Sequence, residues 1–453
     1  MEFINFGKRK SSKLSISLFL LFIFLFSSPS FCKTIGELVQ EGMQFLNQGE
    51  YDEALKSFEE AIERGGENPE VFCYAYFGIG KVYMAQERYK DALENYEKVI
   101  KLAQENNFQE LLATSFNDIG LIYRSMRIYD KALESCQNAL AVGLNVYGEK
   151  HQSTATFYNS IGSVYYLMGV FDKALESYQN GLNIILELFG EKHQSIATFY
   201  NSIGLVYYSM GVFDKALESY QDGLNIILEL FGEKNLLTAA PYDGIGTVYN
   251  SIGEYDKALE FYQKALNIRL ELLEQYRGSR SALLTEIATS YNSIGLSYCS
   301  MGEYDKALEF YQKALNIALE LYGEKHPLIA TIYHNIGSVY DSTYEYDKAL
   351  DYHNKALNIK LELYGEKHQS VAISYSGIAE IYTKTKEYDK ALEFYQKALN
   401  ITLELYGEKH QSVAISYSGI AEIYTKTKEY DKALEFYQKA LNIILELYGE
   451  KHP

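Results

Sequence analysis

Cysteine, proline and tryptophan are scarce or absent in this chain. Its 453 residues include four cysteines, five prolines and no tryptophan. Cys73, Cys136 and Cys299 are widely separated, with no short paired spacing, which argues against a zinc ribbon, a redox pair and a disulfide framework. Cys136 stands where other copies of a repeated segment have tyrosine, so we interpret it as a small buried hydrophobe. The composition, 47% hydrophobic and 23% charged, is that of an ordered chain.

Basic residues are fewer than acidic residues in this chain. The chain has 42 Lys and Arg against 60 Asp and Glu, a formal charge of -18. Because phosphate binding needs a basic footprint, nucleic acid is not expected as a partner. The acidic excess is first of all a solvated surface, and it is compatible with a basic protein partner.

A single long hydrophobic run occurs, near the start of the chain. Leu14 to Phe26 follows a cluster of four basic residues and leads into small residues, which is the layout of a secretory signal peptide. Its 13 residues are too few to cross a hydrocarbon core of ~30 Å at ~1.5 Å per residue. We predict a signal peptide over residues 1–32, export to the periplasm or the exterior, and no stable membrane span after cleavage. The weaker alternatives are an uncleaved membrane anchor and lipidation of Cys32, which Phe31 disfavours.

What the chain has in abundance is repetition. The string EYDKALEFYQKALNI occurs at residues 254–268, 303–317, 387–401 and 429–443. Ten copies align on one alanine and are mostly 42 residues apart: Ala54, Ala92, Ala132, Ala174, Ala216, Ala258, Ala307, Ala349, Ala391 and Ala433. We predict one continuous array, with two shorter repeats over residues 33–106, eight over 107–449 and an incomplete one over 450–453.

The sequence pattern of each repeat predicts two helices. Tyr255, Ala258, Leu259 and Tyr262 follow the spacing of an apolar helical stripe, and a similar pattern precedes each copy. Glycines that follow "ELF" or "ELY" occupy the place where helices end in a left-handed residue. A second glycine, twelve residues before the motif alanine, lies inside the first helix. Mid-helix glycine costs roughly 1 kcal/mol, so its recurrence predicts a close approach of the two helices.

Small residues at Gly204, Ala216 and Gly223, with aromatics at Tyr200, Tyr207, Phe213 and Tyr220, resemble the tetratricopeptide repeat. The 42-residue unit is similar to the lengthened repeats of kinesin light chains. The second helix continues through Leu186, where the family often has proline, and Tyr158, Tyr200 and Tyr242 stand where it often has tryptophan. The resemblance implies an all-α, right-handed superhelical solenoid of about ten stacked helix-turn-helix repeats.

Chemical motifs are missing from the repeats. Six histidines recur in "GEKH" segments, but equivalent residues of stacked helices are at least ~8–10 Å apart, whereas zinc ligands lie ~2 Å from one ion. We therefore assign these histidines a turn role and expect no metal. No phosphate-binding glycine loop, G-x-S-x-G elbow or H-E-x-x-H segment occurs, so we expect neither cofactor nor enzymatic activity.

The candidate site is a surface. The resemblance implies that the residue fifteen before the motif alanine faces the concave groove, and its amide or ring could hydrogen-bond an extended peptide. These candidate groove residues are Asn117, Asn159, Asn201, Asp243, Asn292 and His334, followed by Ser376 and Ser418. The alternative is that the asparagines are tolerated polar residues copied by duplication. A seven-residue insertion between Ala258 and Ala307 carries Arg277 and Arg280, a candidate partner contact or a neutral insertion.

We expect a scaffold that binds partner proteins or peptides in the concave groove. Two alternatives stay open. The array is the recruitment or sensor region of a longer effector, or it is a self-associating structural or adhesive array. For self-association, the last repeat offers an uncapped C-terminal face on which Leu434, Tyr437 and Leu441 are expected to be partly exposed.

Overall fold

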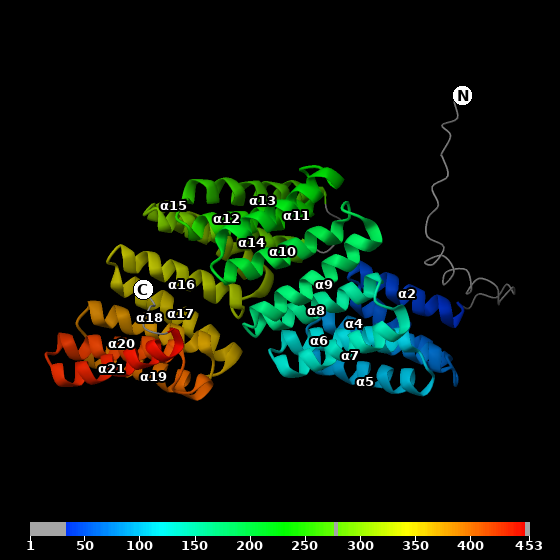
Figure 1. Cartoon of the computed structure of the whole chain (residues 1–453), viewed down its shortest axis with the longest axis horizontal. Coiled ribbons are helices and arrows are strands. Elements are labelled where there is room, and N and C mark those ends of the chain that lie inside the picture. The colour runs from blue at the N-terminus through cyan, green and yellow to red at the C-terminus, as the bar shows by residue number, and fades with distance from the viewer. Residues whose placement is uncertain (1–32, 276–279, 449–453) are drawn as a thin grey trace, which may run out of the picture. The chain divides into compact units, whose positions relative to one another are not determined.

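The computed structural model describes residues 33–275 and 280–448, and these contain twenty α-helices, one short 3₁₀-helix and no strand (Figure 1). The predicted signal peptide and Arg277 lie outside the described residues. The chain divides into two compact units, Met1–Ser202 and Ile203–Pro453, and the boundary falls within helix α10. The expectation of an all-α fold is confirmed.

The first unit consists of consecutive antiparallel helix pairs. Its helices are α2 (Ile35–Gln48), α3 (Tyr51–Arg64), α4 (Pro69–Ala85), α5 (Tyr89–Glu105), α6 (Gln109–Ser125), α7 (Tyr129–Tyr147), α8 (Gln152–Leu167), α9 (Phe171–Phe189) and the start of α10 (Gln194–Ser209). Even-numbered helices are the first members of the pairs, and odd-numbered helices are the second members.

The second unit continues the same alternation. Its helices are the end of α10, α11 (Phe213–Phe231), the 3₁₀-helix η1 (Leu236–Thr238), α12 (Ala239–Ser251), α13 (Tyr255–Gln275), α14 (Arg280–Ser300), α15 (Tyr304–Tyr322), α16 (Pro327–Ser342), α17 (Tyr346–Tyr364), α18 (Gln369–Lys384), α19 (Tyr388–Tyr406), α20 (Gln411–Lys426) and α21 (Tyr430–Tyr448). The ten helix pairs α2/α3 to α20/α21 correspond to the ten copies of the sequence motif.

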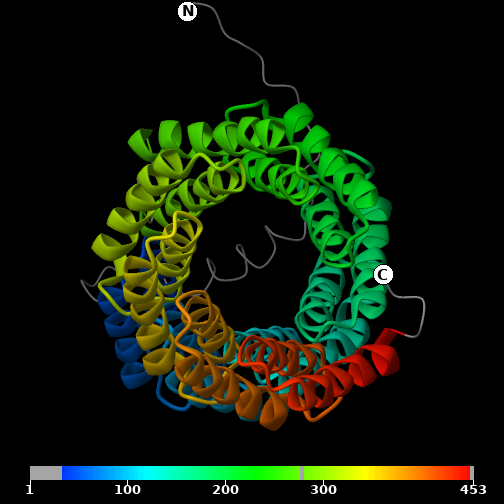
Figure 2. The ribbon, with the colours of Figure 1, turned by 90° about the vertical axis from the view of Figure 1, so that its left-hand side faces the viewer.

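Within each unit the helices form two layers, as Figure 2 shows for each unit separately. Neighbouring first helices contact one another, as α4 contacts α6 and α6 contacts α8 in the first unit, and α14 contacts α16 in the second. Among the described residues, neighbouring second helices make no comparable contacts. Each unit therefore curves with its first helices on the inner side. We call the surface of these first helices the inner face.

In several helix pairs an aromatic ring of the second helix packs on a glycine of the first. The ring of Tyr178 on α9 lies where a Cβ on Gly162 of α8 would come within 2.7 Å of it, and Tyr220 stands 3.0 Å from the same point on Gly204. These glycines leave no room for a larger side chain, as the sequence predicts, but the group that occupies the space is a ring of the second helix and not its backbone. Cys136 is fully buried against Gly120 in the same manner, as expected for a small hydrophobe.

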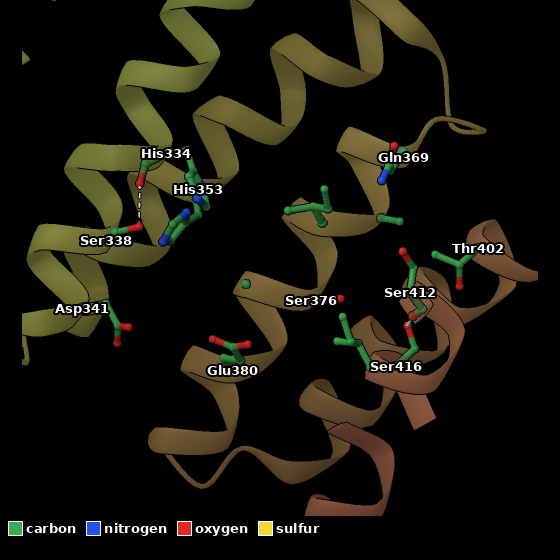
Figure 3. A pocket seen from close by; sticks show the side chains of 14 residues that line it. His334, Ser338, Asp341, His353, Gln369, Ser376, Glu380, Thr402, Ser412 and Ser416 are labelled. Carbon is green, nitrogen blue, oxygen red and sulfur yellow. Dashed lines mark hydrogen bonds between the residues drawn. The ribbon is translucent and has the colours of Figure 1, made fainter. Parts of the chain in front are cut away.

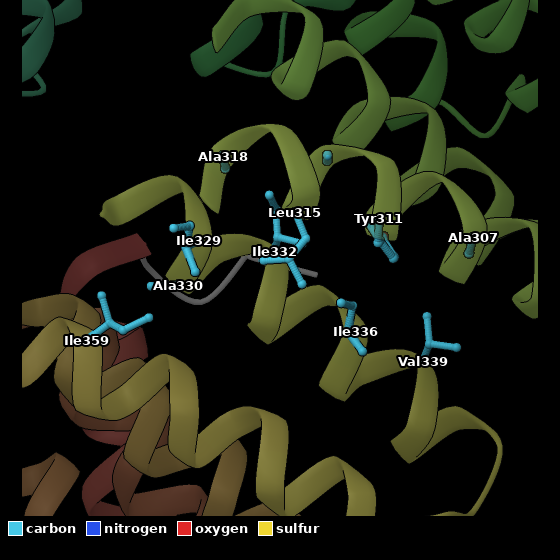
Figure 4. Close-up of a cluster of buried hydrophobic side chains, with 11 residues drawn as sticks. Ala307, Tyr311, Leu315, Ala318, Ile329, Ala330, Ile332, Ile336, Val339 and Ile359 are labelled. Carbon is cyan, nitrogen blue, oxygen red and sulfur yellow. The ribbon is translucent and has the colours of Figure 1, made fainter. Parts of the chain in front are cut away.

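A row of aliphatic side chains joins one pair to the next. In Figure 4, Leu315 and Ala318 of α15 face Ile329 and Ile332 of α16, and all four are buried. Burying each leucine or isoleucine contributes about 1.5–3 kcal/mol. The apolar stripe predicted from the repeat spacing thus continues from one repeat into the next without an intervening polar layer.

The seven-residue insertion lengthens two helices. Helix α13 has 21 residues where α15 has 19, and α14 has 21 where α16 has 16. The four residues 276–279 separate α13 from α14, and four residues also separate α15 from α16. The two extra residues of α13 and the five of α14 together account for all seven inserted residues.

Helix α21, the last helix of the described residues, differs from α19 in how much of its surface is covered. Helices α19 and α21 share the string YDKALEFYQKALNI, yet Tyr395 and Leu399 of α19 are 4% and 3% exposed, whereas Tyr437 and Leu441 of α21 are 43% and 49% exposed. Leu434 is 69% exposed. We call these three residues of α21 the α21 face. The sequence-based expectation of partial exposure is confirmed.

Candidate functional site

Three of the candidate groove residues lie on successive first helices of the first unit. Asn117, Asn159 and Asn201 belong to α6, α8 and α10. Asn117 is only 6% exposed, and the other two are half-buried. The Oδ1 atom of each asparagine is buried and accepts no hydrogen bond from the described residues. A buried polar atom without a partner costs roughly 1–3 kcal/mol, so this position is not optimised for stability.

The other three candidates lie on α12, α14 and α16 of the second unit, and they differ in their partners. Asp243 is paired with Arg269, whose guanidinium nitrogen lies 2.6 Å from Oδ2, while its Oδ1 is buried without a partner. Asn292 accepts a hydrogen bond of 2.9 Å from the Nδ2 of Asn335. The Nδ1 of His334 is buried and unpartnered. The predicted row therefore exists in each unit, but only some of its members keep free polar atoms.

Arg269 is a site residue that the sequence reasoning missed. It is 4% exposed, and it also donates to Glu286 at 2.9 Å and to Ser290 at 2.7 Å. Burial raises the pKa of Asp243, and the neighbouring Arg269 opposes that rise. A sequence signal was present, because equivalent positions in earlier repeats carry the buried isoleucines Ile185 and Ile227. A charged residue at an apolar repeat position indicates a buried ion pair.

Arg280, the other arginine of the insertion, begins α14 and is exposed. The described residues give it no hydrogen bond or ion pair, and Arg277 is outside them. The role of both arginines as partner contacts stays a prediction.

The periodic histidines cap helices. His151, His326, His368 and His410 directly precede first helices, and in each the ring Nδ1 accepts a hydrogen bond from the backbone N–H two residues later. Each ring also stacks on an aromatic residue at the end of the preceding second helix, as His326 does on Tyr322 at 3.7 Å between ring centroids. The hydrogen bond satisfies one of the free N–H groups of the first turn. The turn role inferred from the sequence is thus a helix cap.

A hollow of about 380 Å³ opens on the second unit between α16, α17, α18, α19 and α20 (Figure 3). We call it the His353 hollow. Its lining includes His334 and Asp341 of α16, His353 of α17, and Ser376 and Glu380 of α18. The candidate groove residue His334 therefore belongs to a concave site whose lining combines polar side chains with apolar surface.

Burial and charge set the protonation states around the His353 hollow. Burial, with Lys360 nearby, lowers the pKa of His334 to about 4, and burial with His334, Lys360 and Lys384 nearby lowers that of His353 to about 3. Both imidazoles are therefore neutral at pH 7. The residue Glu380 is exposed as a whole, yet partial burial of its carboxyl group raises its pKa; Lys384 opposes this rise, and Asp341 and Glu422 add to it.

The described residues hold no group of three or more His, Cys, Asp and Glu side chains placed to bind a metal ion. In the same part of the chain, every helix is too short or too polar to cross a membrane.

Comparison with known proteins gives the family. The tetratricopeptide repeat model matches residues 111–187, 153–229, 194–271, 286–362 and 370–446, and a second model of that description matches 73–106. Among curated proteins, the CTR9 homolog of Arabidopsis thaliana is 26% identical over 95 residues, which are 21% of this chain and only 8% of that protein.

Two solved structures are among those to which this chain is similar. A Rap protein complexed with Competence and Sporulation Factor is 17% identical, with a TM-score of 0.52, over 91% of this chain and 98% of that one. A putative kinesin light chain from Podosopora anserina with nearly identical TPR-like repeats is 18% identical, with a TM-score of 0.38, over 46% and 95% of the two chains. The likeness to the Rap protein extends to the fold.

Proposed function

Because the chain belongs to the tetratricopeptide repeat family, we propose that it is a scaffold that binds extended segments of partner proteins along the inner face of its first helices. Tetratricopeptide solenoids are typically non-catalytic interaction modules, and the proposal assigns this chain no reaction.

One observation carries the proposal. At the repeat position fifteen residues before the motif alanine, Asn117, Asn159, Asn201, Asp243 and His334 each have a buried polar atom without a hydrogen-bond partner. A partner backbone offers both donors and acceptors, and pairing with such groups would remove a penalty of roughly 1–3 kcal/mol per atom. Each interaction is small, but a segment that lies across several repeats gains them together.

The test uses partners captured from the native host by the full chain and identified by mass spectrometry. Alanine replaces Asn159, Asn201 and Asn292 together, and the affinity for the captured partner is then measured with purified proteins. We expect the affinity to fall and the melting temperature to change little, because Asn159 and Asn201 each have an unpaired atom in the free protein and Asn292 loses only its one hydrogen bond with Asn335.

A matched control replaces asparagines of the second helices. Asn183, Asn225 and Asn316 are exposed, and each accepts a hydrogen bond from a glutamine four residues earlier. Alanine at these three positions should leave partner affinity unchanged. Equal affinity of both triple variants and the wild type would exclude binding through the inner-face asparagines.

Self-association is a second candidate function, and the α21 face favours it. Its residues match those that α20 covers on α19, but here they remain exposed. An uncovered apolar surface of this kind is seldom left without a partner. The recruitment region of a longer effector is a further alternative that the same binding surface would serve.

Export is the localisation that we propose, on the basis of the basic cluster and the apolar run of residues 14–26. Expression in a bacterial host with a C-terminal tag, followed by fractionation and N-terminal sequencing, tests it. A mature chain that starts near residue 33 supports export. An intact N-terminus in the membrane fraction would instead support the membrane-anchored alternative.

A further inference from the structure

We propose that the His353 hollow is a specificity pocket for an arginine side chain of the bound partner. This proposal rests on the proposed function, because it requires a partner segment on the inner face. It adds the identity of one partner residue and the place where that residue binds.

The hollow results from one substitution in the repeat. In two other repeats a tyrosine ring of the second helix fills the space beside a glycine of the following first helix: a Cβ on Gly244 would come within 2.5 Å of Tyr220, and one on Gly419 within 2.4 Å of Tyr395. The equivalent pair here is His353 and Gly377, and nothing lies within 4 Å of a Cβ on Gly377. The glycine has remained while the ring beside it has become shorter, which leaves room for a flat group from outside.

The charges around the hollow are suited to a cation. Oδ2 of Asp341 pairs with Lys384 at 2.6 Å, but Oδ1 is buried without a partner. Glu380, on the facing helix α18, makes no hydrogen bond or ion pair with the described residues (Figure 3). The other nearby base, Lys360, donates to Ser374 Oγ at 2.8 Å. Besides the ring Nδ1 of His334, the groups of the hollow left without partners are carboxylate oxygens, and each of these atoms can accept a hydrogen bond from a donor.

Of the cationic side chains, arginine fits the shape and the hydrogen-bond acceptors of the His353 hollow best. Its guanidinium is planar, stacks on aromatic rings and donates through several N–H groups to carboxylates, whereas the lysine ammonium is a compact charge. The neutral rings of His334 and His353 lie beside the two carboxylates. Ile373 and Ile415, which are 53% and 56% exposed on the rim, supply apolar surface for the methylene stem.

The experiment uses the full chain and fluorescent peptides of sequence GSIRISG, with arginine, lysine or citrulline at the central position. Citrulline has nearly the shape of arginine without its charge. Fluorescence anisotropy at low salt should give a Kd for the arginine peptide roughly ten-fold below that for the citrulline peptide, with lysine between them.

Substitutions in this chain test whether the arginine peptide binds in the His353 hollow. Glu380→Gln should abolish the preference for arginine over citrulline, and Gly377→Ala, which adds a methyl group where space is open, should weaken binding of the arginine peptide. Glu422→Gln is the matched control, because Glu422 is the counterpart of Glu380 in α20 and does not line the hollow. It should leave the preference intact.

Equal Kd values for the arginine and citrulline peptides, or no binding of the arginine peptide, would overturn the pocket. An effect of Glu422→Gln as large as that of Glu380→Gln would also overturn it, because that result indicates diffuse attraction to an acidic surface. These outcomes leave the proposed function standing if the inner-face alanine variant still loses affinity for its captured partner. If the inner-face alanine variant keeps its affinity for the captured partner while the wild type still prefers the arginine peptide, binding through the asparagines is excluded and the arginine pocket is supported.

Discussion

Acidification should loosen the second unit around α16 and α17. His334 and His353 lie with their ring centroids 5.0 Å apart, and burial lowers the pKa values of the two side chains from 6.5 to about 4 and about 3. Lys360 and Lys384 add positive charge nearby. The native protein therefore binds fewer protons than the unfolded chain at pH values between these pKa values and 6.5. The stability associated with the two histidines is complete above pH 6.5 and is lost as the pH falls toward 4 and below.

The size of the effect follows from the same pKa values. At pH 5 the unfolded histidines are 1.5 units below their pKa and largely charged, while the native ones are still mostly neutral, so each destabilises the fold by about 2 kcal/mol relative to pH 8. The two together amount to about 4 kcal/mol if they act independently. Because repeats are stabilised mainly by their neighbours, the loss should be concentrated in α16, α17 and α18.

The assay is hydrogen exchange with mass spectrometry at pH 8 and pH 5, corrected for the intrinsic pH dependence of exchange. The matched variant His334→Asn/His353→Tyr restores the residues that Asn201 and Tyr220 represent in another repeat. Protection of α16–α18 should fall on acidification in the wild type and much less in the variant, and helices α4–α8 of the first unit should respond alike in both. The reasoning is refuted if both proteins lose the same protection, or if NMR shows that the two wild-type histidines titrate near 6.5.

Three further outcomes are expected. Gly204→Leu should lower the melting temperature far more than Asn201→Leu, since a side chain at Gly204 meets an aromatic ring and overpacking costs about 1–3 kcal/mol or more; similar melting shifts would contradict the packing. Arg269→Ile should destabilise the protein by about 1–3 kcal/mol in denaturant titrations, because it leaves the carboxylate of Asp243, whose side chain is 31% exposed, without its partner. Adding Asp243→Asn should recover most of the loss, and additive losses would argue against the ion pair. Leu434→Gln should reduce any self-association seen by light scattering, and undiminished association would place the contact away from the α21 face.

Much of the fold could be predicted from periodicity. The helix pairs, the glycines at their crossings and the ends of the second helices follow from spacing, because a helix repeats its faces every 3.6 residues and glycine alone tolerates some backbone and packing positions. The role of the periodic histidines was predicted less completely. A residue between two helices was read as part of a turn, but its hydrogen bond to the next helix and its stacking on the previous one require three-dimensional proximity.

The candidate site was predictable by position and much less by chemistry. Counting back from the motif alanine located Asn117, Asn159 and Asn201 on successive first helices, but it could not distinguish them from Asn292, whose amide is already paired with Asn335. Whether a polar atom has a partner depends on side chains from neighbouring repeats. Those side chains are about 40 residues away along the chain and are not related by any local pattern.

The sequence by itself determined the length of the repeat, its two helices and the order in which the repeats follow one another. Each of these depends on local hydrophobic spacing and on the likeness between copies. Only the tertiary structure decided the consequences of the departures from the repeat. Replacement of isoleucine by Arg269 creates a buried ion pair, and replacement of tyrosine by His353 beside Gly377 opens a hollow. The physical reason is that close packing makes the effect of one side chain depend on the volume and charge of every group it touches, and those groups come from several repeats.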